Sequence, residues 1–344
     1  MLLNIVLGFA FAAVVAAKPI ATDDYGNTLE TRVFLGGNVQ VSETDLTNMK
    51  FYSQHSAAAY CNYNTDVGEP IVCKDTTCPL VMQNKPVVIA SMVGRFTGIG
   101  AYVAIDSIRQ EIIFSIRGSN NIRNYITDVI FAWRSCDLAH QCKLHTGFAE
   151  AWDEIKDAAS TAIKSAREKN PGYKVVITGH SLGGAVAIIS TAYLRRDGIP
   201  IDLYTYGAPR VGNDKFANWF SSQQGRHWRV THENDPVPRL PPIFTGYRHV
   251  TPEYWLSGGD AFQTVYDLSE IRVCKGIANI KCNASRFITD ILAHLYYLGY
   301  TGGCSAFPLR LRDGQQEDPL PQDLKDRLTA WSQKDQEFVE ENDI

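Results

Sequence analysis

The sequence lacks the features that would direct it to several common classes of protein. Its 344 residues carry no basic excess, since the formal net charge is −4, and this disfavours a nucleic-acid partner. It contains no Cys-x-x-Cys pair and no histidine at ligand spacing, so no metal site is expected. No internal repeat or low-complexity tract interrupts it. With 45% apolar residues, the chain suits one large α/β domain or two small ones with an ample core.

Long apolar runs are also scarce. Residues 1–17 (MLLNIVLGFAFAAVVAA) form such a run, which is brief for a membrane span and ends in small residues. It predicts a signal peptide, although a positive charge is missing at its start. No other stretch is apolar enough to cross a bilayer, so a secreted, extracellular protein is expected. The polar, turn-rich residues 18–32 are interpreted as a possible propeptide.

Cysteine is present in an even number, eight, in a chain that is predicted to enter an oxidising compartment. Many pairings are formally possible, but three pairs lie close along the chain: Cys73 with Cys78, Cys136 with Cys142, and Cys274 with Cys282. Cys61 and Cys304, near the two ends of the folded region, are left to pair with each other. Asn283-Ala284-Ser285 is the sole glycosylation sequon, and a glycan on Asn283 is expected in a secreted chain.

Strand-like and helix-like segments alternate along the chain. This alternation predicts a central sheet, parallel at its heart, with helices on both faces. Helices are expected at 44–61 and 145–169, the second ended by Asn170-Pro171-Gly172. Strands are expected at 92–106, 110–117, 174–178, 201–206, 227–232, 248–255 and 262–268.

The most informative stretch is 174–184, KVVITGHSLGG. A β-branched run stops at Gly179, and a helix-compatible segment follows Gly183, so Gly-x-Ser-x-Gly lies at a strand–turn–helix junction. Such a turn holds the serine backbone in strain and leaves no room for Cβ atoms two positions away on either side. Ser181 is therefore predicted to be a nucleophile, and the free N–H groups of the following helix point at any oxyanion formed there.

A nucleophilic serine needs a base and an acid that orients the base. In this type of fold the chain order is serine, acid, histidine, each on a loop at the carboxyl edge of the sheet. Asp202 opens a strand, Asp267 lies within a strand pattern, and Asp214 follows a Gly-Asn turn. Asp235 directly follows the strand at 227–232 and precedes a proline, which favours extended geometry. Asp235 is the predicted acid.

Three histidines deserve comparison as bases. His249 lies inside a strand-like segment and is interpreted as a packed or surface residue. His294 follows the last strand, among apolar residues, and it completes the expected chain order. It is the predicted base. His180 is beside the nucleophile, where its side chain points away from Ser181, and it is expected to pack and form hydrogen bonds.

With these residues in place, the chain resembles the secreted class 3 triacylglycerol lipases of filamentous fungi over residues 33–304. The resemblance rests on SIRGSNNIRNYITD, LHTGFAEAW, VVITGHSLGGA, YTYGAPRVGN, ENDPVPRLPP and HLYYLG. It implies an α/β-hydrolase fold with Ser181, Asp235 and His294 as the triad. It also implies an oxyanion hole made by the N–H of Leu182 with the N–H and hydroxyl of Ser119. The four cysteine pairs are compatible with bridges of this family.

Residues 120–134 present apolar side chains at helical spacing: Ile122, Tyr125, Ile126 and Val129. Alone, the pattern predicts a short helix with its apolar face in the core. The resemblance implies instead a lid, whose apolar face covers the serine in water and turns onto lipid at an interface. Tyr125 stands where many relatives carry tryptophan.

The acidic residues 305–344 extend beyond the family's compact end. A disordered acidic tail is the simplest expectation. The alternative is one amphipathic helix through Leu324, Leu328 and Trp331, which would dock on the lid unless the tail is trimmed.

The predicted function is hydrolysis of triacylglycerol esters by a secreted lipase through an acyl-enzyme. The expected partners are an acyl-ester substrate and a lipid–water interface, with no transmembrane segment. The chain is expected to be a monomer and to need no metal or organic cofactor. A feruloyl esterase, and a phospholipase or galactolipase, are alternatives on the same scaffold; the apolar lid series argues against the first. An inactive lipid-binding relative is a further alternative, which the complete triad opposes.

Overall fold

The computed structural model describes residues 41–74, 77–119, 122–127, 131–304 and 320–344, with the side chains at 123–125 left out. The predicted signal peptide, the possible propeptide and Val129 lie outside the described residues. No helix in the described part of the chain is long and apolar enough to span a membrane.

One sheet of eight strands organises the described residues. The strands of its centre run parallel in the order β3-β6-β7-β8-β9, while β1 and β2 on one side and β10 on the other pair antiparallel. The predicted mostly parallel sheet is confirmed. In spatial order the strands are β1 (Val87–Val93), β2 (Gly100–Asp106), β3 (Glu111–Ile116), β6 (Lys174–His180), β7 (Ile201–Tyr206), β8 (His227–His232), β9 (Glu253–Leu256) and β10 (Ile271–Cys274).

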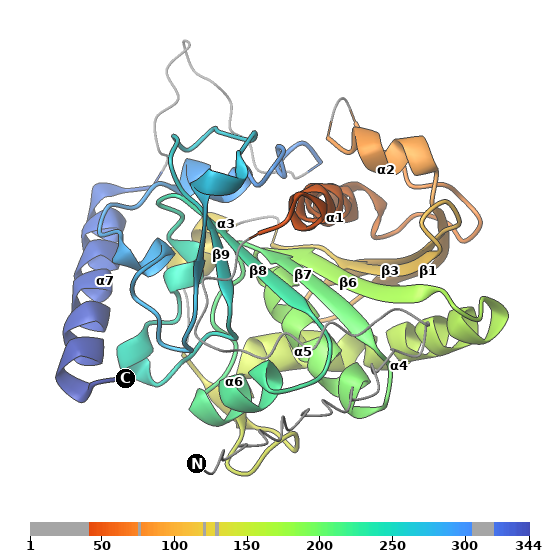
Figure 1. The fold of residues 1–344 in the computed structure, drawn as a ribbon. Coiled ribbons are helices and arrows are strands. Elements are labelled where there is room, and N and C mark those ends of the chain that lie inside the picture. The colour runs from red at the N-terminus through yellow and green to blue at the C-terminus, as the bar shows by residue number, and fades with distance from the viewer. Residues whose placement is uncertain (1–40, 75–76, 120–121, 128–130, 305–319) are drawn as a thin grey trace, which may run out of the picture. The chain divides into compact units, whose positions relative to one another are not determined.

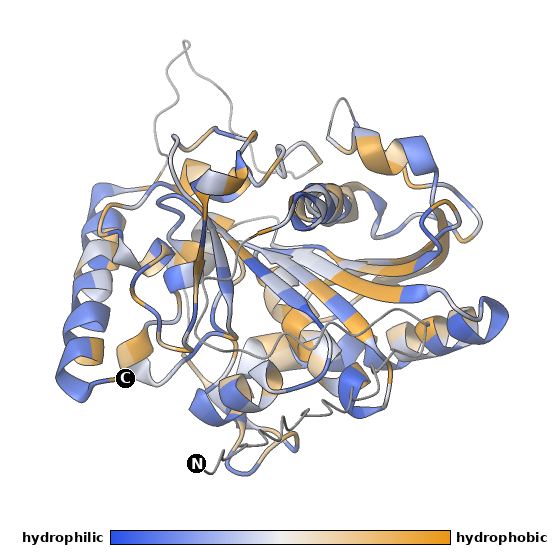
Figure 2. Cartoon of the chain, viewed as in Figure 1, coloured by the Kyte–Doolittle hydropathy of each residue, from blue (hydrophilic) through white to orange (hydrophobic). Residues whose placement is uncertain are grey.

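Helices cover both faces of this sheet (Figure 1). On one face lie α1 (Glu43–Asn62) and α2 (Pro79–Asn84). On the other lie α4 (Thr146–Lys169), α5 (Leu182–Arg196) and α6 (Asp214–Ser221). The central strands β3 and β6 are buried along almost their whole length, as expected for strands that are covered on both faces. The hydrophobic parts of the central strands are orange in Figure 2.

Short elements surround the sheet. They are α3 (Ile122–Thr127), the ribbon of β4 (Trp133–Ser135) and β5 (Lys143–His145), and the 3-10 turns η1 (Val237–Arg239), η2 (Ile243–Thr245), η3 (Leu268–Glu270), η4 (Asn283–Ser285) and η5 (Ile291–Leu295). Helix α7 (Gln322–Asn342) closes the chain. A disordered tail is therefore the wrong expectation for this last part, which forms the alternative helix.

Three of the strand predictions need correction. The segment 92–106 is divided between β1 and β2 by a turn that contains Gly98 at φ +64°. The strand expected at 248–255 begins only at Glu253. The strand expected at 262–268 is wrong: Asp260 accepts from the Phe262 N–H, and Asp267 and Glu270 form a capping box around η3. These local bonds replace the backbone pairing of a strand.

All four predicted cysteine pairs are confirmed. Cys61 is bridged to Cys304, Cys73 to Cys78, Cys136 to Cys142, and Cys274 to Cys282. The first bridge joins the end of α1 to the segment that follows η5, across 243 residues of sequence.

Candidate active site

Ser181 occupies the sharp turn between β6 and α5. Its backbone has φ 59° and ψ −131°, a combination that a non-glycine residue adopts only where the surrounding structure imposes it. Its N–H donates to the carbonyl of Tyr206 at 2.8 Å, which fixes the turn to the neighbouring strand. We call residues 179–183 the serine turn.

The glycines of the serine turn are required by close backbone contacts, as the sequence predicts. A Cβ on Gly179 would lie 2.4 Å from the carbonyl oxygen of Gly183. A Cβ on Gly183 would lie 2.2 Å from the carbonyl oxygen of Ile116 on β3. Both distances are far below van der Waals contact with atoms that cannot move aside, so only glycine fits.

Geometry distinguishes the candidate acids. Asp235 Oδ2 lies 2.7 Å from His294 Nδ1, and Asp235 Oδ1 accepts from the Val237 N–H at 2.9 Å. The competing aspartates lie elsewhere: Asp202 is in β7, Asp214 begins α6, and Asp267 precedes η3. Asp235 belongs to the segment 233–239, which follows β8 and which we call the acid loop. The structure therefore brings Asp235 and His294 together, as predicted.

His294 and Ser181 share one small cavity. His294 lies in η5, and both residues are almost fully buried. Within the described residues, neither Ser181 Oγ nor His294 Nε2 has a hydrogen-bond partner, although both line this cavity. Because the cavity holds only about 10 Å³, it is too small for an ester substrate. The site is therefore closed, and Ile122 of α3 is one of the residues that line it.

The predicted oxyanion donors flank the same serine. Leu182 is the first residue of α5, so its N–H belongs to the first helical turn, where no intrahelical acceptor exists. Ser119 follows β3 and lines the cavity together with Ser181 and His294.

The other two histidines have structural roles. His180 forms hydrogen bonds to the Tyr60 hydroxyl at 2.9 Å and to the carbonyl of His294 at 2.7 Å. Burial holds the pKa of His180 well below 6.5, so it stays neutral. His249 bonds the carbonyl of Pro238 at 2.6 Å, and burial likewise lowers its pKa. The predicted packing and hydrogen bonding of His180 are confirmed. His249, predicted as a packed or surface residue of a strand, is packed but lies before β9.

Sequence reasoning missed two contributors to the site. The Tyr297 hydroxyl donates a short hydrogen bond to Asp235 Oδ2, beside the bond from His294. Gly207 lies at φ 59°, and a Cβ there would come within 2.9 Å of the His294 ring. Tyr297 follows His294 by three residues, just after η5, and nothing in this spacing indicates that its hydroxyl contacts Asp235.

Asn283, the predicted glycan acceptor, is buried. Its side chain is 1% exposed, and Nδ2 donates to the carbonyls of Glu233 and Asp235. A sugar on Nδ2 would break one of these bonds and has no room in the folded protein. This geometry opposes the glycan that the sequon predicts.

Two of the apolar residues predicted for the lid, Ile122 and Ile126, are buried. Ile122 and Ile126 of α3 form one cluster with Val237, Leu240 and Ile291 around the acid loop, and with Leu320, Leu324 and Leu328 at the C-terminal end. The Tyr125 side chain and Val129 lie outside the described residues.

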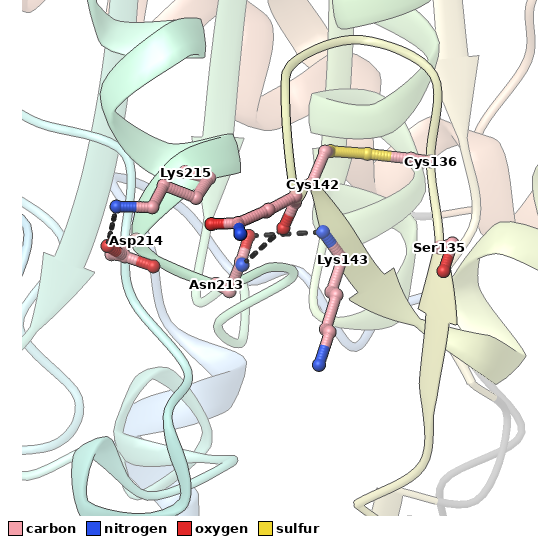
Figure 3. A pocket seen from close by; sticks show the side chains of 8 residues that line it. Ser135, Cys136, Cys142, Lys143, Asn213, Asp214 and Lys215 are labelled. Atoms are coloured by element: carbon pink, nitrogen blue, oxygen red, sulfur yellow. Dashed lines mark hydrogen bonds and ion pairs between the residues drawn. A yellow bond between two sulfur atoms is a disulfide. The ribbon is translucent and has the colours of Figure 1, made fainter.

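A larger hollow lies away from these residues (Figure 3). It encloses about 550 Å³ and is lined by polar side chains and the Cys136–Cys142 bridge. Asn213 there accepts from the Lys143 N–H, and Lys215 pairs with Asp214. The described residues that line it include no histidine.

The fold and the site together define a serine hydrolase of the α/β-hydrolase type: a strand–serine–helix turn, followed along the chain by an acid and a histidine that meet. Residues 113–245 match the model of the family "Lipase (class 3)". The chain belongs to this lipase family.

Individual relatives agree with this assignment. The chain is 48% identical to a secreted mono- and diacylglycerol lipase 1 of Fusarium solani, over 99% of each chain. A solved mono- and diacylglycerol lipase of Aspergillus oryzae superposes with a TM-score of 0.73 at 34% identity, covering 76% of this chain and all of that one. A triacylglycerol lipase whose catalytic centre is described as a serine protease triad has a TM-score of 0.67 at 30% identity, covering 78% of this chain and 100% of that one.

Proposed function

We propose that Ser181, Asp235 and His294 are the catalytic triad with which this lipase hydrolyses acylglycerol esters. The observation that carries the proposal is the 2.7 Å hydrogen bond between Asp235 Oδ2 and His294 Nδ1. It lies beside a cavity that His294 and Ser181 both line. In this arrangement the acid holds the imidazole in the tautomer whose Nε2 faces the nucleophile.

The reaction then follows from the positions of the groups. His294 Nε2 takes the proton of Ser181 Oγ as this oxygen attacks the ester carbonyl. Leu182 and Ser119 donate to the oxyanion, and His294 returns the proton to the leaving alcohol. A water molecule repeats the sequence on the acyl-enzyme and releases the fatty acid. The steps need no metal or organic cofactor.

The closed cavity supports a lid formed by α3. Opening would expose Ile122 and Ile126, which costs roughly 25 cal/mol per Å² in water and is offset by contact with lipid. Activity on a short-chain ester should therefore rise where droplets form, and Ile126→Asp should flatten the rise. Smooth saturation without this rise in the wild type would contradict the lid.

The contacts of helix α7 with α3 support a second point, that α7 holds the lid closed. Leu324 and Leu328 pack in one cluster with Ile122 and Ile126, and Arg327 Nη2 donates to the carbonyl of Thr127 at 3.0 Å. The buried pair of Arg210 and Asp335, at 3.1 Å, anchors the same helix.

Truncation after Ser305 should therefore raise activity on emulsions, and Leu328→Ala in the full chain should raise it partly. The exposed Gln333→Ala is the control on the same helix. Equal specific activities of the full and truncated chains would leave α7 no role in restraint.

The preferred ester is tested by comparing initial rates side by side. The substrates are emulsified tri-, di- and monoacylglycerols, phospholipids, galactolipids and feruloyl esters. The 48% identity to a mono- and diacylglycerol lipase favours partial glycerides as a second candidate beside triacylglycerols. Labelling of Ser181 by a phosphonate ester, located by mass spectrometry, tests the nucleophile independently of the substrate.

The relatives named as secreted lipases and the four bridges support export of this chain. We propose that 1–17 is removed as a signal peptide, that 18–32 is a propeptide, and that residues 33–304 act as a monomer at the lipid–water interface. N-terminal sequencing and size-exclusion chromatography of the secreted enzyme test these points.

A further inference from the structure

The main chain that carries the catalytic acid is held by a side chain from outside the acid loop. Asn283 Nδ2, in η4, donates to the carbonyl of Glu233 at 3.0 Å and to the carbonyl of Asp235 at 3.1 Å. Because the amide has two hydrogens, both are committed to this segment. One buried side chain thus bridges the residues on either side of Asn234.

The carbonyls of three successive residues are accounted for in this way. The carbonyl of Asn234 accepts from Arg239 Nη2 at 2.7 Å and from the Asp290 N–H at 3.1 Å. The carbonyl of Glu233 accepts from Trp255 Nε1 as well as from Asn283. In the described part of the chain, Asn283 is the one donor to the carbonyl of Asp235. Loss of its amide would leave a buried acceptor unpaired.

The backbone here also needs external support. Glu233 has φ +31°, in the left-handed region that a non-glycine residue occupies only when its surroundings hold it there. Its carboxylate accepts from the N–H groups of Gly258 and Gly259, while its carbonyl is held by Asn283. Relaxation of this residue would rotate the chain two residues before the acid.

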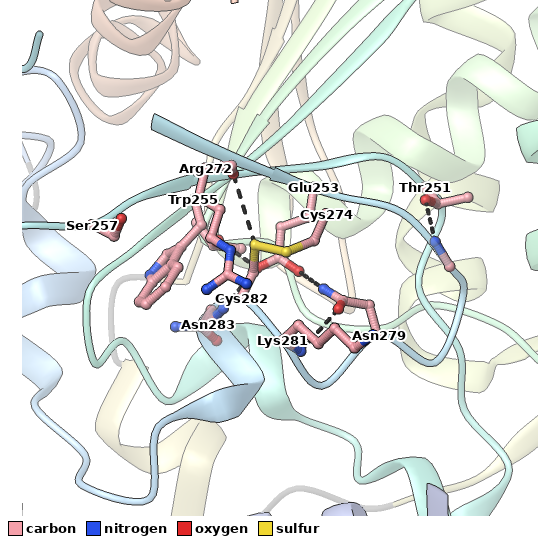
Figure 4. The surroundings of a disulfide bond; sticks show 12 residues. Thr251, Glu253, Trp255, Ser257, Arg272, Cys274, Asn279, Lys281, Cys282 and Asn283 are labelled. Atoms are coloured by element: carbon pink, nitrogen blue, oxygen red, sulfur yellow. Dashed lines mark hydrogen bonds between the residues drawn. A yellow bond between two sulfur atoms is a disulfide. The ribbon is translucent and has the colours of Figure 1, made fainter. Parts of the chain in front are cut away.

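Asn283 is itself fixed on a rigid support (Figure 4). Cys282, its neighbour, is bridged to Cys274 at the end of β10. The N–H of Asn283 donates to Glu253 Oε1 at 3.2 Å, and Glu253 Oε2 is paired with Arg229 at 2.9 Å. The amide is therefore carried by the sheet edge formed by β9 and β10.

We propose that Asn283 is a positioning residue for the reaction, which holds Asp235 toward His294, and that it consequently carries no glycan in the active enzyme. The proposal rests on the proposed role of Asp235. A glycosylated amide keeps only one N–H, so it cannot make both bonds, and the site is buried.

Two substitutions test the positioning role. Asn283→Asp keeps the size of the side chain but removes both donors, and Asn283→Ser removes the amide without adding charge. In both, kcat on a soluble short-chain ester should fall about tenfold or more, while KM changes by less than about twofold. Phosphonate labelling of Ser181 should slow in parallel.

The matched control is Asn279→Ala. Asn279 lies in the same loop and donates to Glu253 Oε2 at 3.0 Å, but not to the acid loop. The melting temperature of the Asn279→Ala variant should fall, while its kcat should stay at the wild-type value. If kcat of the Asn283 variants is unchanged, or falls only as far as in Asn279→Ala at equal stability, the positioning role is overturned.

The glycan is tested on the wild type, which needs no folded variant. Secretion from a eukaryotic host, followed by intact-mass measurement with and without endoglycosidase, should show an unmodified Asn283. Ser285→Ala destroys the sequon but leaves Asn283, and it should keep full activity. A glycan on Asn283 in catalytically active molecules would refute the inference. Failure of Ser181 labelling or of ester hydrolysis in the wild type would instead refute the proposed function.

Discussion

The serine turn and the acid loop reach the same precision by opposite means. The serine turn is built from one continuous stretch, and its tightest contacts join Gly179 to Gly183 and Gly183 to β3. The acid loop is held by groups that lie far along the chain, among them Trp255, Asn283 and Tyr297. The residues that define the serine turn are thus contiguous in the sequence, although one close contact reaches β3, whereas the acid loop depends on side chains from distant parts of the fold.

Ser181→Ala, in the serine turn, should cause the largest loss of activity. Hydrolysis of a short-chain ester should fall about 10⁶-fold, because the reaction loses its proposed nucleophile. The melting temperature should stay near that of the wild type, since Ser181 Oγ makes no hydrogen bond among the described residues. Ser190→Ala, a buried serine further along α5, is the control and should remain active. Substantial turnover by the Ser181 variant would contradict the assignment.

Asp235→Asn comes next. The amide keeps the shape but favours the wrong tautomer of His294, so kcat should fall about 10⁴-fold with little loss of stability. The comparison is made with Asp267→Asn, which alters a competing aspartate that caps η3 and should stay active. The reverse ranking of these two variants would move the acid to Asp267.

Glu253→Gln probes the support beneath the acid loop rather than the chemistry. Burial raises the pKa of Glu253, but Arg229 and hydrogen bonds from Thr231 and Asn283 outweigh it and lower the pKa below 4.5. Breaking the buried pair with Arg229 should cost about 3 to 5 kcal/mol of unfolding free energy at neutral pH, measured by denaturant titration.

The same pair gives a pH dependence with a defined sign. A carboxylate whose folded pKa is lowered stabilises the protein fully above its unfolded value of 4.5. This contribution is lost as the pH falls through the folded value. The stability difference between wild type and Glu253→Gln should therefore shrink below pH 4.5, and a constant difference down to pH 2.5 would exclude this origin.

Tyr297→Phe should have the smallest effect. It removes one hydroxyl that donates to Asp235 but keeps the ring, so about 1.5 to 3 kcal/mol is at stake. If the bond mainly stabilises the carboxylate in the transition state, kcat should fall about ten- to a hundredfold. Tyr300→Phe is the control, because no hydrogen bond joins its hydroxyl to Ser181, Asp235 or His294 in the described part of the chain. An unchanged kcat in Tyr297→Phe would show that the Tyr297 hydroxyl does not contribute to the action of Asp235.

The sequence predicts the local half of the site well. The β-branched run before Gly179 and the helix after Gly183 are short-range signals, and they place Ser181 correctly in its turn. The paired cysteines are also recognisable, because three of the four bridges close short loops. The chain order of serine, acid and histidine then narrows the remaining choices.

The distant half could not be predicted in the same way. Nothing around Asn283 shows that its amide reaches Asp235, because the contact depends on the packing of η4 against the acid loop. The sequon even suggests the opposite, a residue at the surface. The false strand at 262–268 has a related cause: Phe262, Val265 and Tyr266 favour a strand, but Asp260 and Asp267 satisfy the backbone locally.

The bridge between Cys61 and Cys304 gives the molecule a covalent topology with an inside and an outside. The ring that it closes contains Ser181, Asp235 and His294, so one peptide cleavage anywhere within it leaves both fragments attached. Helix α7 lies outside the ring, at Gln322–Asn342. A single cut between residues 305 and 321 therefore breaks the covalent link between α7 and the ring, while Ser181, Asp235 and His294 stay within one covalent unit. A single cut in this segment separates α7 covalently from the rest, whereas a single cut between residues 61 and 304 separates nothing.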